Sequence, residues 1–354
     1  MRKLMNYFCI MSVILAFSTI HAGSEPASDQ EAGKSPSVVY LESYTGEIGE
    51  IQDAIWNFIK LGAHSNDAKA IEGERRAVIM RIKKLVEFIK EIKPYNNDTI
   101  LKKAFSDYVN SLLYIMEEDY GKLVNMEEIA EQSYDLMEAY LAAKEKANEK
   151  FSAIANEMEL KQKEYAALYN IDLIFDESET VKNLREAGRV TNYHDSVYLI
   201  FFKSHKQELY LLDAVSHNDI SKIEQNRLTL QKYSQEGLKA LKNIKPFKND
   251  NSLKIICQKL LSFYSAESME KMPVMLDFLM KQEAFEKLKK AYELKKEDER
   301  TREDVDLYNA KVNEVNEAVK KYNSTVKALN EKRSDLINEW NGVEAVFFDR
   351  HVPR

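Results

Sequence analysis

The sequence is poor in the residues that make turns. Its 354 residues include only 10 Gly and 6 Pro, whereas average composition would give roughly 25 and 18. Doubly wound sheets, β-sandwiches and glycine-rich disordered chains need more turn residues than this. Because 44% of the residues are hydrophobic and 31% are charged, the composition favours long helices and predicts an all-α protein.

The N-terminus has the pattern of a secretory signal peptide. Met1-Arg2-Lys3 supplies positive charge, an apolar stretch follows from about Phe8 to Ile20, and Ala22-Gly23 offers a small residue for cleavage. An uncleaved membrane anchor is the alternative, but a spanning helix needs roughly 20 apolar residues. We therefore predict that residues 1–22 are removed on export to the periplasm, the cell surface or the medium, and we expect no later membrane span.

Cysteine is scarce as well, and the charge is negative. Removal of residues 1–22 would take away Cys9, so Cys257 alone would remain and no intramolecular disulfide could form. Loss of Arg2 and Lys3 reduces Lys plus Arg from 51 to 49, against 58 Asp plus Glu, which leaves a net charge of −9. This balance disfavours general nucleic-acid binding. Residues 23–37, rich in small and charged residues, are predicted to form a flexible leader.

An internal repeat is the strongest pattern in the chain. Ile92-Lys93-Pro94-Tyr95 recurs as Ile244-Lys245-Pro246-Phe247, and at this offset of 152 the segment 66–112 has 13 identities over 47 positions. Upstream the similarity continues with a one-residue slip, as at Tyr40 and Tyr193. Gene duplication explains the pattern better than chance similarity between helical segments.

The apolar periodicity and the residues that cap or end helices predict the same four-helix plan in each copy. Asn-Asp pairs are suited to cap helices, and the prolines end them. The helices expected in copy one span about 39–64, 67–92, 98–117 and 126–170, and those in copy two about 192–217, 219–245, 250–265 and a very long region to 348. We predict two tandem antiparallel bundles with long coiled-coil-like fourth helices: unit 1 at 38–170, a connector at 171–190, and unit 2 at 191–354.

The last helix carries a regular seam. From Val305 to Trp340 the seam residues follow an unbroken 3-4 spacing, which is typical of a coiled coil. All of them are apolar or aromatic except Arg333. Beside the seam, asparagines recur every seven residues, at Asn309, Asn316, Asn323 and Asn330. The seam could pack within the protein's own bundle, or with the asparagines it could form a docking face for a second copy or another protein.

These features resemble a poorly characterised family of exported helical surface proteins of spirochaetes and Bacteroidetes. The resemblance rests on the signal peptide, the duplicated helical plan, the seven-spaced asparagines and the C-terminal residues Arg333, Trp340, Phe348, His351 and Pro353. It implies a location in the cell envelope and no known catalytic activity.

One pair of residues offers ligands for a metal. His205 and Glu208 lie one turn apart on an apolar helix face and could bind one cation together. The stretch is similar to the HxxE element of imelysin-type exported proteins, which implies iron or haem handling, although Lys203 stands where that family has glycine and copy one has neither ligand around Gln52 to Trp56. A buried pair satisfied by hydrogen bonds is the commoner explanation.

The chain contains none of the usual catalytic or nucleotide-binding motifs, such as a P-loop, GxSxG, HExxH or a calcium loop. We therefore expect no cofactor and no enzymatic activity. The leading hypothesis is an exported protein that presents helical surfaces to an envelope or extracellular partner, with a homodimer as one form. The alternative is a periplasmic metal- or haem-handling protein that uses His205 and Glu208.

Overall fold

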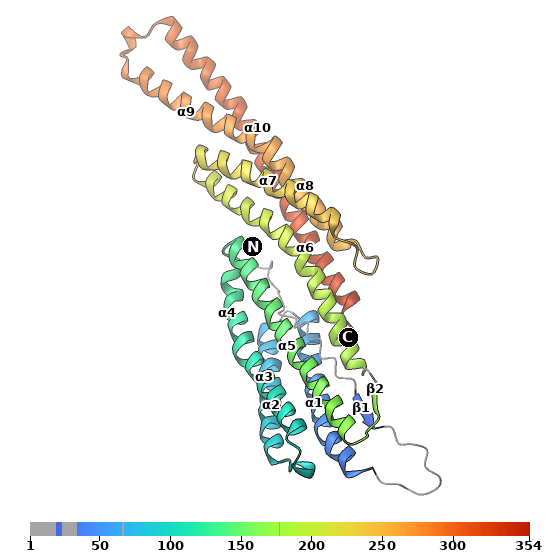
Figure 1. The fold of residues 1–354 in the computed structure, drawn as a ribbon. Coiled ribbons are helices and arrows are strands. Elements are labelled where there is room, and N and C mark those ends of the chain that lie inside the picture. Colours follow the sequence, from blue (N-terminus) through green and yellow to red (C-terminus); the bar gives the residue numbers. More distant parts are fainter. Residues whose placement is uncertain (1–18, 23–33, 66, 177) are drawn as a thin grey trace. The chain divides into compact units, whose positions relative to one another are not determined.

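The computed structural model describes residues 19–22, 34–65, 67–176 and 178–354 and confirms the all-α fold (Figure 1). Most of the predicted signal peptide and leader, residues 1–18 and 23–33, lies outside the described residues. The helices are α1 Pro36–His64, α2 Ala68–Glu91, α3 Ile100–Tyr114, α4 Tyr120–Ala130, α5 Tyr134–Leu168, α6 Glu179–Ser216, α7 Ile220–Asn243, α8 Ser252–Ala266, α9 Met272–Leu294 and α10 Arg302–His351.

Short elements join or interrupt these helices. Two π-helical turns, η2 Ile115–Asp119 and η3 Glu267–Lys271, interrupt otherwise continuous helices, and 3-10 turns occur at η1 Tyr95–Asn97 and η4 Glu297–Glu299. Two short strands, β1 Thr19–Ala22 and β2 Leu173–Asp176, pair antiparallel. None of the described helices is long and apolar enough to cross a membrane.

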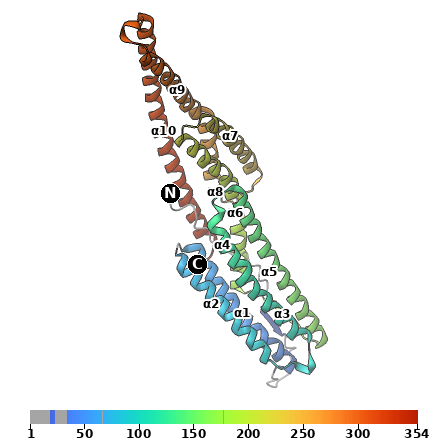
Figure 2. The same ribbon diagram turned by 90° about the vertical axis from the view of Figure 1, so that its left-hand side faces the viewer.

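The helices form two compact units. Their bounds differ from the predicted 38–170 and 191–354: unit 1 comprises the described residues up to Asp195 with Ala345–Arg354, and unit 2 comprises Ser196–Glu344, so α6 and α10 contribute to both. In unit 1, α2 packs on α1 and α3, and α5 packs on α3 and α4 (Figures 1 and 2). In unit 2, α7 packs on α8 and α9. Each unit encloses an apolar core, with residues such as Tyr44 and Phe105 in unit 1 and Phe201 and Trp340 in unit 2.

The repeat found in the sequence recurs in the helix bounds. Helices α2 and α7, α3 and α8, and the π turns η2 and η3 each begin and end 152 residues apart. The local causes are shared, because Asp67 and Asp219 cap α2 and α7 by accepting backbone N–H groups. The two copies therefore have the same local plan from α2 to the π turn.

An arginine contact is repeated too. Arg75 of α2 pairs with Glu72 and donates to the carbonyl of Met116 in η2 at 2.8 Å. Arg227 of α7 pairs with Glu224 and donates to the carbonyl of Ser268 in η3 at 3.2 Å. A π turn shifts the backbone hydrogen bonding out of its α-helical register, and in both copies an arginine supplies a donor to a carbonyl within it.

Two predicted boundaries were wrong. The predicted connector 171–190 is helical from Glu179 onward, because Val181, Leu184, Ala187 and Val190 form a buried stripe that outweighs Gly188. The predicted helix 126–170 is divided between α4 and α5. The division falls where the Ser133 side chain accepts from the amide of Leu136 and so starts a new helix.

The predicted very long helical region up to Phe348 is a hairpin of α9 and α10 (Figures 1 and 2). Between the two helices lies the charged segment that begins at Lys295. Helix α10 starts at a capping box, in which the Asp304 amide donates to the Thr301 hydroxyl and the Thr301 amide donates to the Asp304 carboxylate. The periodicity of α10 continues unbroken, but α9 is a separate helix that packs along it.

Candidate functional site

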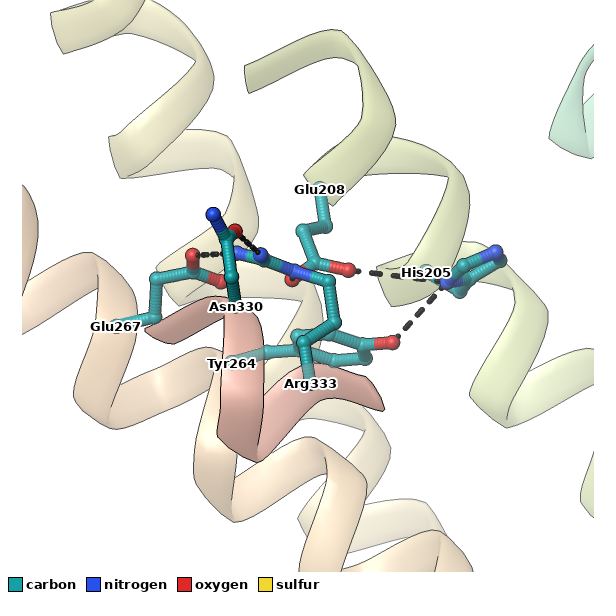
Figure 3. Close-up of polar contacts among 6 residues, drawn as sticks. All are labelled: His205, Glu208, Tyr264, Glu267, Asn330 and Arg333. Carbon is teal, nitrogen blue, oxygen red and sulfur yellow. Dashed lines mark hydrogen bonds and ion pairs between the residues drawn. The ribbon is translucent and has the colours of Figure 1, made fainter. Parts of the chain in front are cut away.

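The predicted pair, His205 and Glu208, lies buried in unit 2 on α6. Nδ1 of His205 is 3.8 Å from Oε2 of Glu208, and the same ring nitrogen is 3.1 Å from the hydroxyl of Tyr264 on α8 (Figure 3). The apolar stripe of α6 explains their burial, because Phe201 and Leu211 on the same stripe are fully buried. The ring of Phe201 stacks on His205 at 5.3 Å and on Trp340 at 4.4 Å.

Arg333 of α10 completes the cluster. Its Nε donates to Oε1 of Glu208 at 2.5 Å, its Nη2 donates to Oε1 of Glu267 at 2.5 Å, and its Nη1 donates to Oδ1 of Asn330 at 2.6 Å (Figure 3). Both carboxylate side chains are 0% exposed, and that of Arg333 is 14% exposed. We call His205, Glu208, Tyr264, Glu267 and Arg333 the polar cluster.

The two glutamates share one guanidinium, which leaves the pair with one surplus negative charge when both are ionised. Burial raises the pKa of Glu267 to about 9, and repulsion from the Glu208 carboxylate adds to this. Burial also raises the pKa of Glu208, although Arg333 opposes the change. The electrostatics therefore favour a state in which the pair carries one proton.

The hydrogen bonds point to the same state. Among the described residues, Oε2 of Glu208 and Oε2 of Glu267 have no hydrogen-bond partner of good geometry, although the Tyr264 hydroxyl and the Glu267 carboxyl group lie close enough to Glu208 to influence its pKa as hydrogen-bond partners. A buried oxygen without a donor costs free energy. A proton on either carboxyl group would supply a donor.

The geometry bears directly on the metal interpretation. Glu208 already accepts a hydrogen bond from a guanidinium, whose positive charge repels a cation, and within the described part of the chain no group of three His, Cys, Asp or Glu side chains could hold a metal ion. A metal at His205 and Glu208 stays a prediction, and it would have to displace Arg333 from Glu208.

Unit 1 has a different set of residues at the equivalent positions. Along α1 and α6 the two copies align at an offset of 153, as they do at Tyr40 and Tyr193. Residues that correspond at this offset are both buried: Tyr44 with Val197, Ile48 with Phe201, and Phe58 with Leu211. On this alignment Gln52 and Ile55 correspond to His205 and Glu208, and at an offset of 152 Leu112 and Ile115 correspond to Tyr264 and Glu267. All four residues of unit 1 are buried and three are apolar.

The seam of α10 is covered unequally along its length. Near the C-terminal end Leu336 and Trp340 are buried, at 2% and 0% exposure. Toward the N-terminal end Tyr308 and Tyr322 are half-buried, and α9 covers them with Phe285 at 5.5 Å and Phe278 at 4.6 Å. The valines between them are half-buried as well: Val312, Val315 and Val319.

The four asparagines predicted as an interaction face are all exposed: Asn309, Asn316, Asn323 and Asn330. Asn330 differs from the others because it joins the polar cluster through Arg333. The structure thus divides the predicted row: Asn330 borders the polar cluster in the core of unit 2, whereas Asn309, Asn316 and Asn323 form an exposed amide row along the hairpin.

Sequence reasoning missed three members of the polar cluster: Tyr264, Glu267 and Arg333. A signal existed for Arg333, because it occupies an apolar position of the seam and a buried arginine there requires an acidic partner. Glu267 had a weaker signal: at the offset of 152 it aligns with the apolar Ile115, but three residues beyond the segment 66–112 in which the repeat is recognisable.

Comparison of the chain with models of protein families, with curated proteins and with solved structures found no match.

Proposed function

We propose that this protein is an exported, non-enzymatic helical protein that acts by protein–protein contact, and that its α9–α10 hairpin binds the hairpin of a second copy. The observation that carries the proposal is the incompletely buried N-terminal part of the α10 seam, flanked by the exposed row of Asn309, Asn316 and Asn323. Export is proposed from the N-terminal pattern of residues 1–22.

A two-helix hairpin covers a coiled-coil seam from one side only. Two such hairpins that pack together form a four-helix bundle and bury the remaining apolar surface. The valines of α10 are half-buried although α9 already packs on this helix. Association of two hairpins would therefore remove further apolar surface from water, which is favourable by about 25 cal/mol per Å².

The chemistry of the asparagine row suits a second copy of the same chain. In a two-fold symmetric contact, residues near the axis meet their own counterparts. A lysine there would meet another lysine and repel it, whereas an amide both donates and accepts hydrogen bonds and can pair with an identical amide. Amides beside a seam also help to set the register of the helices.

Light scattering on the purified protein tests the proposal, and we expect twice the mass of one chain. Asn316→Lys should shift the protein toward monomer, because it places two positive charges near the symmetry axis. Ala310→Lys is the control: Ala310 is exposed on the same helix, about 100° around the helix axis from Asn309 and on the side away from the seam. A wild-type monomer at all concentrations, or a dimer equally sensitive to both substitutions, would contradict the proposed contact.

A further inference from the structure

We infer that unit 2 binds one proton between Glu208 and Glu267 as part of its folded core, and that loss of this proton loosens α10 from α6 and η3. The inference is independent of self-association. It rests on the sharing of one guanidinium by two carboxylates that are fully buried, and on the apolar residues that unit 1 has at the equivalent positions.

The charged and titratable groups around the pair come from four elements. Helix α6 provides His205 and Glu208, α8 provides Tyr264, η3 provides Glu267, and α10 provides Arg333 (Figure 3). On α7, Arg227 reaches η3 only through the carbonyl of Ser268 and is paired with Glu224. Helix α9 turns the apolar residues Met272, Met275 and Leu276 to the core. Arg333 is thus the cation that balances the two glutamates.

A proton resolves two problems of this site at once. It removes the surplus negative charge, and it turns one carboxyl group into a donor for an oxygen that otherwise has none. If the proton is lost, the two buried carboxylates repel each other and one negative charge stays unbalanced, which favours opening of the contact that joins α10 to α6 and η3.

Comparison with unit 1 argues that the helix plan does not require this cluster. Ile55 and Ile115 fill the positions of Glu208 and Glu267 there, at 0% and 2% exposure. Replacement of a buried ion pair by apolar residues of similar volume is often neutral or stabilising. Because isoleucine can occupy both positions, packing does not explain the ionic cluster of unit 2. Its two carboxyl groups and single guanidinium instead make the stability of the unit depend on a bound proton.

The direction of the pH effect follows from linkage. The folded unit holds a proton that the unfolded chain releases above the ordinary pKa of glutamic acid, 4.5, and the folded pKa of Glu267 is about 9. The stabilisation is fully present below 4.5 and is lost as the pH rises toward 9. Within this window the unfolding equilibrium constant of unit 2 should rise by up to about tenfold per pH unit.

The two tryptophans allow each unit to be followed separately. Trp56 is buried in unit 1 and Trp340 in unit 2, so Trp56→Phe leaves a fluorescence signal from unit 2 alone. We would measure denaturant unfolding of this variant across the window, at two protein concentrations to separate the effect from self-association. Glu267→Gln should abolish the pH slope, because the amide resembles the protonated acid. Glu270→Gln is the control, since Glu270 is exposed on the same π turn.

Three results would overturn the inference. The first is an unchanged slope in Glu267→Gln. The second is loss of the slope in His205→Gln, which substitutes the residue of unit 1 and would place the proton on the imidazole. The third needs no variant: the infrared C=O band of a protonated carboxylic acid should be present in the folded wild-type protein at neutral pH and should disappear in alkaline solution, and its absence at neutral pH would also overturn the inference.

Discussion

Units 1 and 2 share their helix bounds from α2 to η2 and from α7 to η3, but their cores differ. At four buried positions unit 1 has Gln52, Ile55, Leu112 and Ile115, while unit 2 has His205, Glu208, Tyr264 and Glu267. The bounds of α2 and α7 and of α3 and α8 nevertheless coincide at the offset of 152. Helix bounds and core chemistry therefore vary independently, because caps and prolines act locally whereas a core residue needs partners from other helices.

The largest effect should come from Arg333. Arg333→Met leaves Glu208 and Glu267 buried without their cation, which costs about 3–5 kcal/mol in buried pairs of this kind. We expect the unfolding free energy of unit 2, followed by Trp340 fluorescence, to fall by this amount near neutral pH while the Trp56 signal of unit 1 stays unchanged.

The same substitution can be turned into a test of the comparison. Adding Glu208→Ile and Glu267→Ile to Arg333→Met gives unit 2 the residues of unit 1 at both acidic positions. Stability should return to within about 1–2 kcal/mol of the wild type, because no buried charge is left unpaired. If the triple variant is as unstable as Arg333→Met alone, the two cores are not interchangeable.

A smaller loss of stability is expected when the corresponding arginine of either unit is removed, and the loss should be equal in the two units. Arg75→Ala and Arg227→Ala each remove a hydrogen bond to a carbonyl of a π turn, at Met116 and Ser268. Each should lower the unfolding free energy of its own unit by about 1–2 kcal/mol. The measurement is denaturant unfolding read from the tryptophan of the affected unit, and a response in only one unit would show that the repeated contact is not equivalent.

The smallest effect concerns one turn residue. Asn96 and Lys248 are equivalent and both have a left-handed backbone, with φ of 49° and 47°. Asparagine tolerates this region better than lysine, so Lys248→Asn should stabilise unit 2 by about 0.5 kcal/mol. The reciprocal change, Asn96→Lys, should destabilise unit 1 by a similar amount in thermal unfolding, and effects of the opposite sign would contradict this explanation.

The fold could be predicted from the sequence to the extent that its signals are local. The caps at Asp67 and Asp219 and the prolines at 94 and 246 lie at the predicted helix boundaries. The break between α4 and α5 was missed because Ser133 is a weak signal within a continuous helical pattern. The start of α6 was missed because Gly188 and the acidic residues before it resemble a linker, although the stripe from Val181 to Val190 was visible.

The candidate site was predictable only in part. His205 and Glu208 share one helix, so their spacing alone places them together. Their partners are distant in sequence: Arg333 is 125 residues from Glu208 and 66 from Glu267. No periodicity within one helix reports which residue of another helix it meets.

The sequence by itself determined the helical class, the repeat and the amphipathic faces, since these depend on neighbours within a few residues along the chain. Only the tertiary structure decided that Arg333 holds two glutamates, that α9 covers one side of the α10 seam, and that the asparagine row remains exposed. The reason is that pairing between helices depends on which buried surfaces meet, and that choice is made by the packing of the whole unit.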